Sequence, residues 1–167
     1  MKEIIDRLTS YNIFNYLLPG TLFIGLGDTL TSYTLIQDNI LIALFLYYFI
    51  GLIISRIGSL TLEPLLKWIK FVKFAPYEDY VKASQLDPKI EIFSEQNNMY
   101  RSLCMLSIAL ILLKIYDLAW GSGLPDNAVI IFIFLIGLLV LFLLSYRKQT
   151  KYVVKRVKIT LEDKEEE

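Results

Sequence analysis

The 167-residue sequence contains no histidine and only one cysteine, Cys104, which lies inside an apolar run. Histidine is the side chain that most often serves as a general acid or base near neutral pH, and it is a common transition-metal ligand. A single cysteine forms neither an internal disulfide nor a cysteine-based metal site. Glycine-rich phosphate loops and hydrolase nucleophile elbows are also absent from the sequence. We therefore expect a protein that is not an enzyme and holds no cofactor or metal.

Charged residues are scarce over long stretches, and 55% of the chain is hydrophobic, against roughly 45–50% in soluble domains. Four apolar stretches stand out: residues 11–26 (which could extend to 36), 40–54, 103–120 and 128–146. A helix needs about 20 apolar residues to cross a bilayer core of roughly 30 Å. A chain this small has too little polar volume to enclose four such helices in water. The sequence predicts an all-α, polytopic protein with four transmembrane helices.

Basic residues fall almost entirely on one side of this four-helix arrangement. Sixteen of the seventeen Lys and Arg residues lie before the first stretch, between the second and third, or after the fourth; Lys114 is the exception. The loops at residues 27–39 and 116–127 carry acidic residues and no basic ones. Because positively charged loops remain in the cytoplasm, we expect both termini there. The expected location is a bacterial inner membrane.

This topology divides the chain into four parts: residues 1–55 (a first transmembrane hairpin), 56–101 (a cytoplasmic loop), 102–146 (a second hairpin) and 147–167 (a basic, then acidic tail). The loop is expected to contain amphipathic helices. One starts near Thr61–Pro64 and carries apolar and basic residues at helical spacing through residue 74. Another starts after Pro76 and is broken at residues 87–88. Residues 89–93 read as extended, and Ser94 as the cap of a helix leading into the third crossing.

Lys114 and Asp117 are three residues apart, so they share one face of the third transmembrane helix. Ionisable groups inside a crossing often have a function, and this pair could line a polar pathway or hold a neighbouring subunit. The structural interpretation, which we favour, places both near the outer interface. Lys114 would then extend its amine toward the headgroups, and Asp117 would be hydrated.

Small residues recur every four positions on the second helix at Gly51, Ser55 and Ser59. This spacing allows close helix contact in lipid, within one subunit or between subunits. The first helix is interrupted by Pro19 and Gly20. They could break it and expose backbone groups, but a kinked helix packed closely against a neighbour is the interpretation we favour.

A basic cytoplasmic surface is expected from nine residues: Lys67, Lys70, Lys73, Arg147, Lys148, Lys151, Lys155, Arg156 and Lys158. It could dock an acidic protein partner, a nucleic acid or a nucleotide. Attraction to anionic membrane lipids explains the same charges. Direct contact with nucleic acid is not expected, because no nucleic-acid-binding motif accompanies the charge.

The layout, a short four-helix membrane chain with no enzymatic motif, resembles small polytopic subunits of bacterial anti-phage defence systems, such as the membrane subunit of the Kiwa system. The resemblance covers the general plan and assigns no residue a role. It implies a homo-oligomer that works with a cytosolic partner. The leading hypothesis is a non-enzymatic membrane sensor or effector subunit that couples a cytoplasmic partner to the membrane. A small ion channel or transporter with an oligomeric pore, and a purely structural membrane anchor, are the alternatives.

Overall fold

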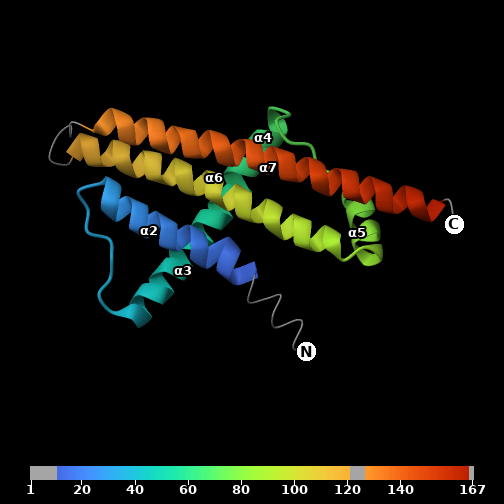
Figure 1. The fold of residues 1–167 in the computed structure, drawn as a ribbon, viewed down its shortest axis with the longest axis horizontal. Coiled ribbons are helices and arrows are strands. Elements are labelled where there is room, and N and C mark those ends of the chain that lie inside the picture. Colours follow the sequence, from blue (N-terminus) through green and yellow to red (C-terminus); the bar gives the residue numbers. More distant parts are fainter. Residues whose placement is uncertain (1–10, 121–126, 166–167) are drawn as a thin grey trace.

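The structure is a computed structural model that describes residues 11–120 and 127–165, and every regular element in this part of the chain is helical (Figure 1). The prediction of an all-α chain is confirmed for these residues. The elements, in chain order, are η1 (Ile13–Leu17), α2 (Leu18–Leu30), α3 (Ile40–Ile57), η2 (Gly58–Leu62), α4 (Glu63–Trp68), α5 (Tyr77–Leu86), α6 (Lys89–Trp120) and α7 (Ala128–Glu165).

Three helical segments in the described part of the chain are long and apolar enough to cross a membrane: Ile40–Trp68, Lys89–Trp120 and Ala128–Lys164. Their large apolar side chains are widely exposed, as for Phe45 on α3 (79% exposed) and Ile133 on α7 (66%). Exposed apolar surface on this scale marks contact with lipid or another protein rather than water. The chain therefore has the build of an integral membrane protein. The first apolar stretch forms a helix, η1–α2, but is not among these three segments.

The helices form two antiparallel hairpins (Figure 1). In one, α6 and α7 pack side by side along the longest axis of the molecule. In the other, η1–α2 crosses α3, and both pack on α6. The core between the hairpins contains Ile54 of α3, Leu103, Leu106 and Leu110 of α6, and Leu135 of α7. Because α7 packs mainly on α6, most of its apolar surface is left outside the molecule.

Two prolines are accommodated by π-helical turns rather than by breaks. η1 ends two residues before Pro19, and η2 ends two residues before Pro64. In each turn the backbone widens to a five-residue hydrogen bond, from Leu18 N to Ile13 O and from Glu63 N to Gly58 O. A proline ring crowds the carbonyl one turn earlier and donates no hydrogen bond, and a widened turn relieves both problems. The favoured interpretation, a kinked helix packed closely against a neighbour, agrees with the structure in that the helix is unbroken at Pro19 and Gly20 packs closely against α3.

Three expectations for residues 56–101 are wrong. No helix starts at Thr61, because α3 continues through η2 into α4, and the helix stops at Trp68 instead of reaching residue 74. Residues 89–93 are not extended, and Ser94 is not a cap, because α6 already begins at Lys89. Asp87 supplies the start instead: its side chain accepts a hydrogen bond from Lys89 N at 3.1 Å, as an N-cap residue does. The helix from Pro76 is found as α5.

The residues after the fourth apolar stretch do not form a separate tail, because α7 runs without interruption to Glu165. Its C-terminal half packs against α5 and the start of α6. A small apolar core joins these three elements through Ala83, Ile90, Val153 and Val157. We call this part of the molecule, residues 77–100 and 147–165, the platform. The two helices that continue into it are the helices of the long hairpin.

Candidate functional site

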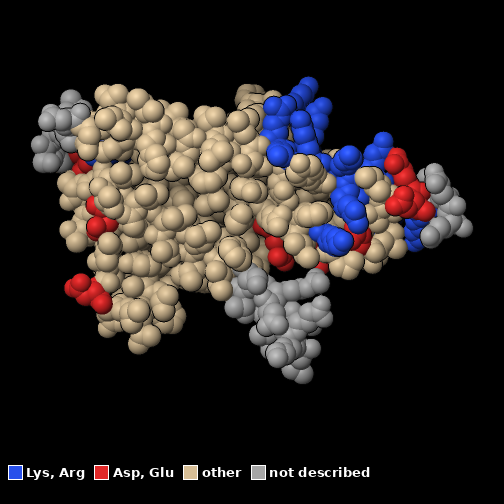
Figure 2. Space-filling view, viewed as in Figure 1, with Lys and Arg blue, Asp and Glu red and all other residues tan. Residues whose placement is uncertain are grey.

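A basic groove of about 450 Å³ runs between the segment that follows α4 and the C-terminal half of α7. Six of the described residues that line it are basic and none is acidic: Lys70, Lys73, Arg147, Lys151, Lys155 and Lys158. Figure 2 shows Lys and Arg gathered at this end of the molecule, next to a wide uncharged band. The groove brings together two segments that lie more than seventy residues apart in the sequence.

One wall of the groove depends on how α4 ends. Lys70 adopts a left-handed backbone conformation, with φ of 57°. Phe71 N donates to Leu66 O at 2.9 Å, and Lys70 N donates to Lys67 O at 3.0 Å. These two bonds define a Schellman motif, in which the left-handed position is usually glycine. Lysine at this position carries a backbone cost of about 1 kcal/mol relative to glycine, and it places a charge at the mouth of the groove.

The chain after Lys70 is anchored beside α7 by two apolar residues. Val72 is 3% exposed and packs with Leu66 and Tyr146. The Arg147 guanidinium lies 5.0 Å from the centre of the Phe71 ring, within the range of a cation–π contact. Phe71 therefore holds one of the cationic side chains that line the groove. Sequence analysis missed this role for Phe71, because the contact joins residues far apart in the chain.

The cations of the groove are poorly neutralised. In the described part of the chain, the only lining residue with an ion pair is Lys158, whose amine lies 3.4 Å from Glu162 in an exposed position. Exposed pairs of this kind contribute little, typically below about 1 kcal/mol. The remaining five cations of the groove have no carboxylate within ion-pair distance among the described residues. Unopposed like charges in a hollow create a local attraction for anions.

The other three predicted basic residues lie outside the groove. Lys67 pairs with Glu63 at 2.7 Å, and Lys148 lies over the Tyr152 ring at 5.8 Å. Arg156 pairs with Asp87 at 2.5 Å and ties α7 to the start of α6. The hydrogen bond from this guanidinium holds the pKa of the Asp87 carboxyl below its usual value. Lys67 and Arg156 are therefore parts of structural pairs.

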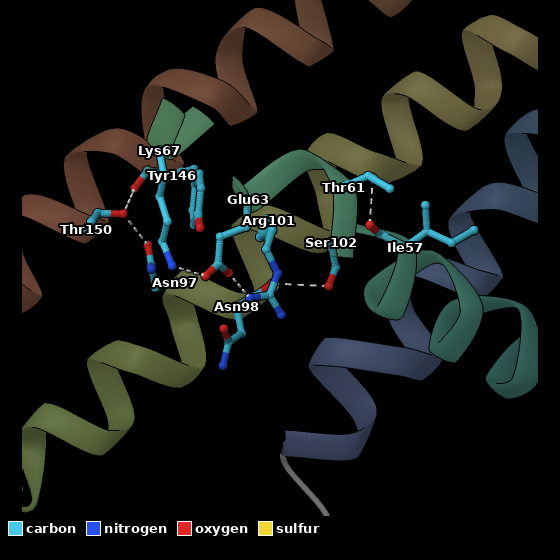
Figure 3. Close-up of polar contacts among 10 residues, drawn as sticks. All are labelled: Ile57, Thr61, Glu63, Lys67, Asn97, Asn98, Arg101, Ser102, Tyr146 and Thr150. Carbon is cyan, nitrogen blue, oxygen red and sulfur yellow. Dashed lines mark hydrogen bonds and ion pairs between the residues drawn. The ribbon is translucent and has the colours of Figure 1, made fainter. Parts of the chain in front are cut away.

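A buried polar network lies behind the groove (Figure 3). The Thr150 hydroxyl is 3.0 Å from Asn97 Oδ1 and 2.8 Å from the carbonyl oxygen of Tyr146. Arg101 donates to Glu63 at 2.5 Å, which joins α6 to α4. The Tyr146 hydroxyl and Arg101 Nε are buried there without a hydrogen-bond partner among the described residues. The network fixes α4, α6 and α7 relative to one another where the helices leave the apolar region.

Lys114 and Asp117 lie at the opposite end of the molecule, and the expectation that Lys114 reaches the headgroups and Asp117 is hydrated is wrong. Lys114 is 3% exposed and Asp117 is 5% exposed, and their side chains form an ion pair at 2.8 Å. Asp117 also accepts a hydrogen bond from Ser32 N at 3.1 Å and one from the Ser32 hydroxyl. Lys114 therefore does not extend to the interface and Asp117 is not hydrated, because both side chains are buried and Asp117 is bonded to Lys114 and to Ser32 of the chain after α2.

The small residues of the second helix lie at helix contacts within the chain. Gly51 is buried against η1 and α2, Ser55 is also buried, and Ser59 is partly exposed in η2. Gly58, which the spacing pattern did not include, packs against α6: a Cβ there would lie 3.2 Å from Met105 Cβ. Gly51 and Gly58 therefore serve packing inside one subunit.

The described residues contain no metal cluster, and the comparisons found no relative. Among the described residues, no group of three or more Cys, Asp or Glu side chains is placed to hold a metal ion. Cys104 is fully buried in the core behind the groove. Comparison with known proteins found no matching family model, no similar curated protein and no similar solved structure.

Proposed function

We propose that this chain is a non-enzymatic membrane subunit that couples a cytoplasmic protein partner to the membrane. The observation that carries the proposal is the continuity of α6 and α7 from the apolar region into the platform. Each is a single uninterrupted helix, of 32 residues in α6 and 38 in α7. A displacement or tilt at one end of such a hairpin is transmitted to the other, because both helices are joined by cores along their length.

In the proposed topology, the basic end faces the cytoplasm and η1–α2 is a fourth crossing. The distribution of Lys and Arg supports this orientation, and the packing of η1–α2 against α3 and α6 supports its insertion beside them. Both termini then lie in the cytoplasm of a bacterial cell. The platform projects from the membrane as the structured surface that a partner can contact.

We assign the partner contact to a second hollow on the platform, of about 420 Å³, which lies on another side of α7 from the basic groove. Phe93, Tyr152 and Ile159 line it, and Tyr152 is 51% exposed. Its polar lining is Gln149, Arg156 and Lys155, the last of which also lines the basic groove. Aromatic side chains beside polar ones are typical of protein interfaces. The exposed apolar surface of α7 in the membrane region supports a homo-oligomer, because a second copy would cover surface that α6 leaves free.

The plan of the chain, as a small membrane subunit without catalytic groups, supports a place in prokaryotic anti-phage defence. In such a system the subunit would report an event at the membrane to a cytosolic effector. The proposal that the chain couples a cytoplasmic protein to the membrane does not depend on a role in anti-phage defence.

Photo-crosslinking in the native host tests both contacts. A photoreactive amino acid at Tyr152 or Ile159 is expected to give an adduct with one and the same cytoplasmic protein. The same amino acid at Phe134, on the exposed apolar surface of α7, is expected to give an adduct with a second copy of the chain. Gln85, exposed on α5, serves as the control position. Absence of any foreign protein adduct at both Tyr152 and Ile159 would contradict the coupling proposal.

A further inference from the structure

We propose that the basic groove binds the headgroup of an anionic phospholipid that carries two phosphates. This assignment concerns the groove, which adjoins the hollow assigned to the protein partner and shares Lys155 with it; it is tested on the purified chain without that partner. It goes beyond a general attraction of basic residues to the membrane, because it names one site, its lining residues and the chemistry of its occupant.

The position of the groove relative to the apolar region favours a lipid. Arg147 directly follows the uncharged run of α7 that ends at Tyr146. With a rise of about 1.5 Å per residue, Lys151 lies roughly 6 Å beyond Arg147 along the helix and Lys158 roughly 16 Å beyond it. The headgroup layer of one leaflet is about 5–8 Å deep. The inner half of the groove is therefore at the level of lipid phosphates.

The second wall of the groove carries the features of a segment that lies at a membrane surface. Trp68 and Ile69, directly before Lys70, are 79% and 53% exposed. Exposed aromatic and aliphatic residues beside lysines favour the boundary between acyl chains and headgroups. A lipid whose headgroup enters the groove can thus place its acyl chains along apolar surface that the protein already exposes.

The charge of the groove favours more than one phosphate. Its lining holds six cations, of which five lack an ion pair among the described residues. Two or three such cations are enough to bind the oxygens of one phosphate group, since lysine and arginine both bind phosphate strongly. A volume of about 450 Å³ accommodates a headgroup with two phosphates. Basic pockets at this level of a membrane protein are suited to such lipids.

Native mass spectrometry of the full chain in an uncharged detergent measures this binding directly. The chain is equilibrated with cardiolipin, which carries two phosphates, or with phosphatidylglycerol at equal total phosphate. We expect one cardiolipin to be retained per chain and phosphatidylglycerol to be retained much more weakly. In the Lys151→Gln/Lys155→Gln variant, cardiolipin affinity is expected to fall roughly thirtyfold, since each lysine near a lipid surface contributes about one kilocalorie per mole.

Two further variants separate charge from folding and from position. Lys70→Gly removes a cation and suits the left-handed backbone, so cardiolipin affinity is expected to fall about fivefold while the thermal midpoint stays equal or rises. Lys82→Gln/Lys148→Gln removes two exposed lysines outside the groove and is expected to leave cardiolipin affinity nearly unchanged.

Three results would overturn the assignment. Equal losses in both double variants would mean a diffuse electrostatic attraction. Equal retention of phosphatidylglycerol and cardiolipin would remove the requirement for two phosphates. Complete displacement of cardiolipin by an equal concentration of pyrophosphate would identify a soluble phosphate ligand in place of a lipid.

Discussion

Gly20 and Gly51 face each other where α2 crosses α3, so closely that neither position has room for a side chain. A Cβ on Gly20 would lie 1.7 Å from the carbonyl oxygen of Tyr47, and a Cβ on Gly51 would lie 1.7 Å from that of Tyr16. Each glycine thus packs against the backbone of the other helix. Close backbone approach of this kind is a main source of helix association in lipid.

Replacing either glycine by alanine should force the two helices apart. We expect Gly20→Ala and Gly51→Ala each to destabilise the fold by about 1–3 kcal/mol or more, as overpacking does. Gly25 lies on the same helix as Gly20, and a Cβ there would have no atom within 4 Å, so Gly25→Ala should be neutral or slightly stabilising. Thermal unfolding in detergent measures the difference. Equal midpoints for Gly20→Ala and Gly25→Ala would contradict the crossing geometry.

Removing one member of the buried Lys114–Asp117 ion pair should lower the free energy of unfolding more than replacing both residues by apolar ones. Asp117→Asn leaves the Lys114 charge buried without its counter-ion, which costs about 3–5 kcal/mol in comparable sites. The Lys114→Met/Asp117→Leu variant removes both charges and is expected to recover much of that loss. A double-mutant cycle that compares Lys114→Met, Asp117→Leu and the double variant in thermal unfolding gives the coupling. Additive effects of the two single changes would show that the pair does not interact.

The hydrogen bond between Asp87 and Arg156 predicts a pH-dependent contribution to stability. Because the pKa of Asp87 is lowered in the folded state, its contribution is complete above the ordinary value near 3.8 and is lost as pH falls through the folded value. Asp87→Asn keeps a capping oxygen for Lys89 and removes the charge. We expect it to lower stability by less than about 1 kcal/mol at pH 7 and to match the parent chain at pH 2.

The control for this comparison is Glu78→Gln, which removes an exposed carboxylate from α5. It should leave the stability difference between pH 7 and pH 2 as it is in the parent chain. If Asp87→Asn lowered stability as much at pH 2 as at pH 7, the carboxyl group would contribute through packing rather than through its charge.

The proposed topology predicts which positions an impermeant thiol reagent reaches in intact cells. The native Cys104 is fully buried and should remain silent. The Asp38→Cys variant should be labelled from outside, whereas the Glu162→Cys variant should be labelled only after the membrane is permeabilised. Labelling of both in intact cells would contradict the assignment of the basic end to the cytoplasm.

Local sequence signals determined a good part of the helical architecture. The uncharged run at residues 128–146 defined the first half of α7, because no polar group interrupts its hydrophobicity. Pro76 and the acidic residues after it marked the start of α5. The side chain of Asn39 caps α3, with Leu41 N and Ile42 N at 3.0 and 3.3 Å from its oxygen, a local signal that our sequence analysis did not use. Such signals act within one turn of helix, so the sequence displays them directly.

The tertiary structure alone decided the rest, because it depends on contacts between distant residues. Hydrophobicity indicated that Lys114 and Asp117 are near a helix end, but only the tertiary structure shows that both are buried and that Asp117 is bonded to Ser32. The charge pattern indicated nine basic residues, but packing of Val72 and the bend at Lys70 bring six lysines and arginines into one groove. The order of apolar and charged residues in the sequence thus determined that the chain is a helical, membrane-type protein with its basic residues at one end. Long-range packing determined which charges neutralise one another and which are left open to an anion.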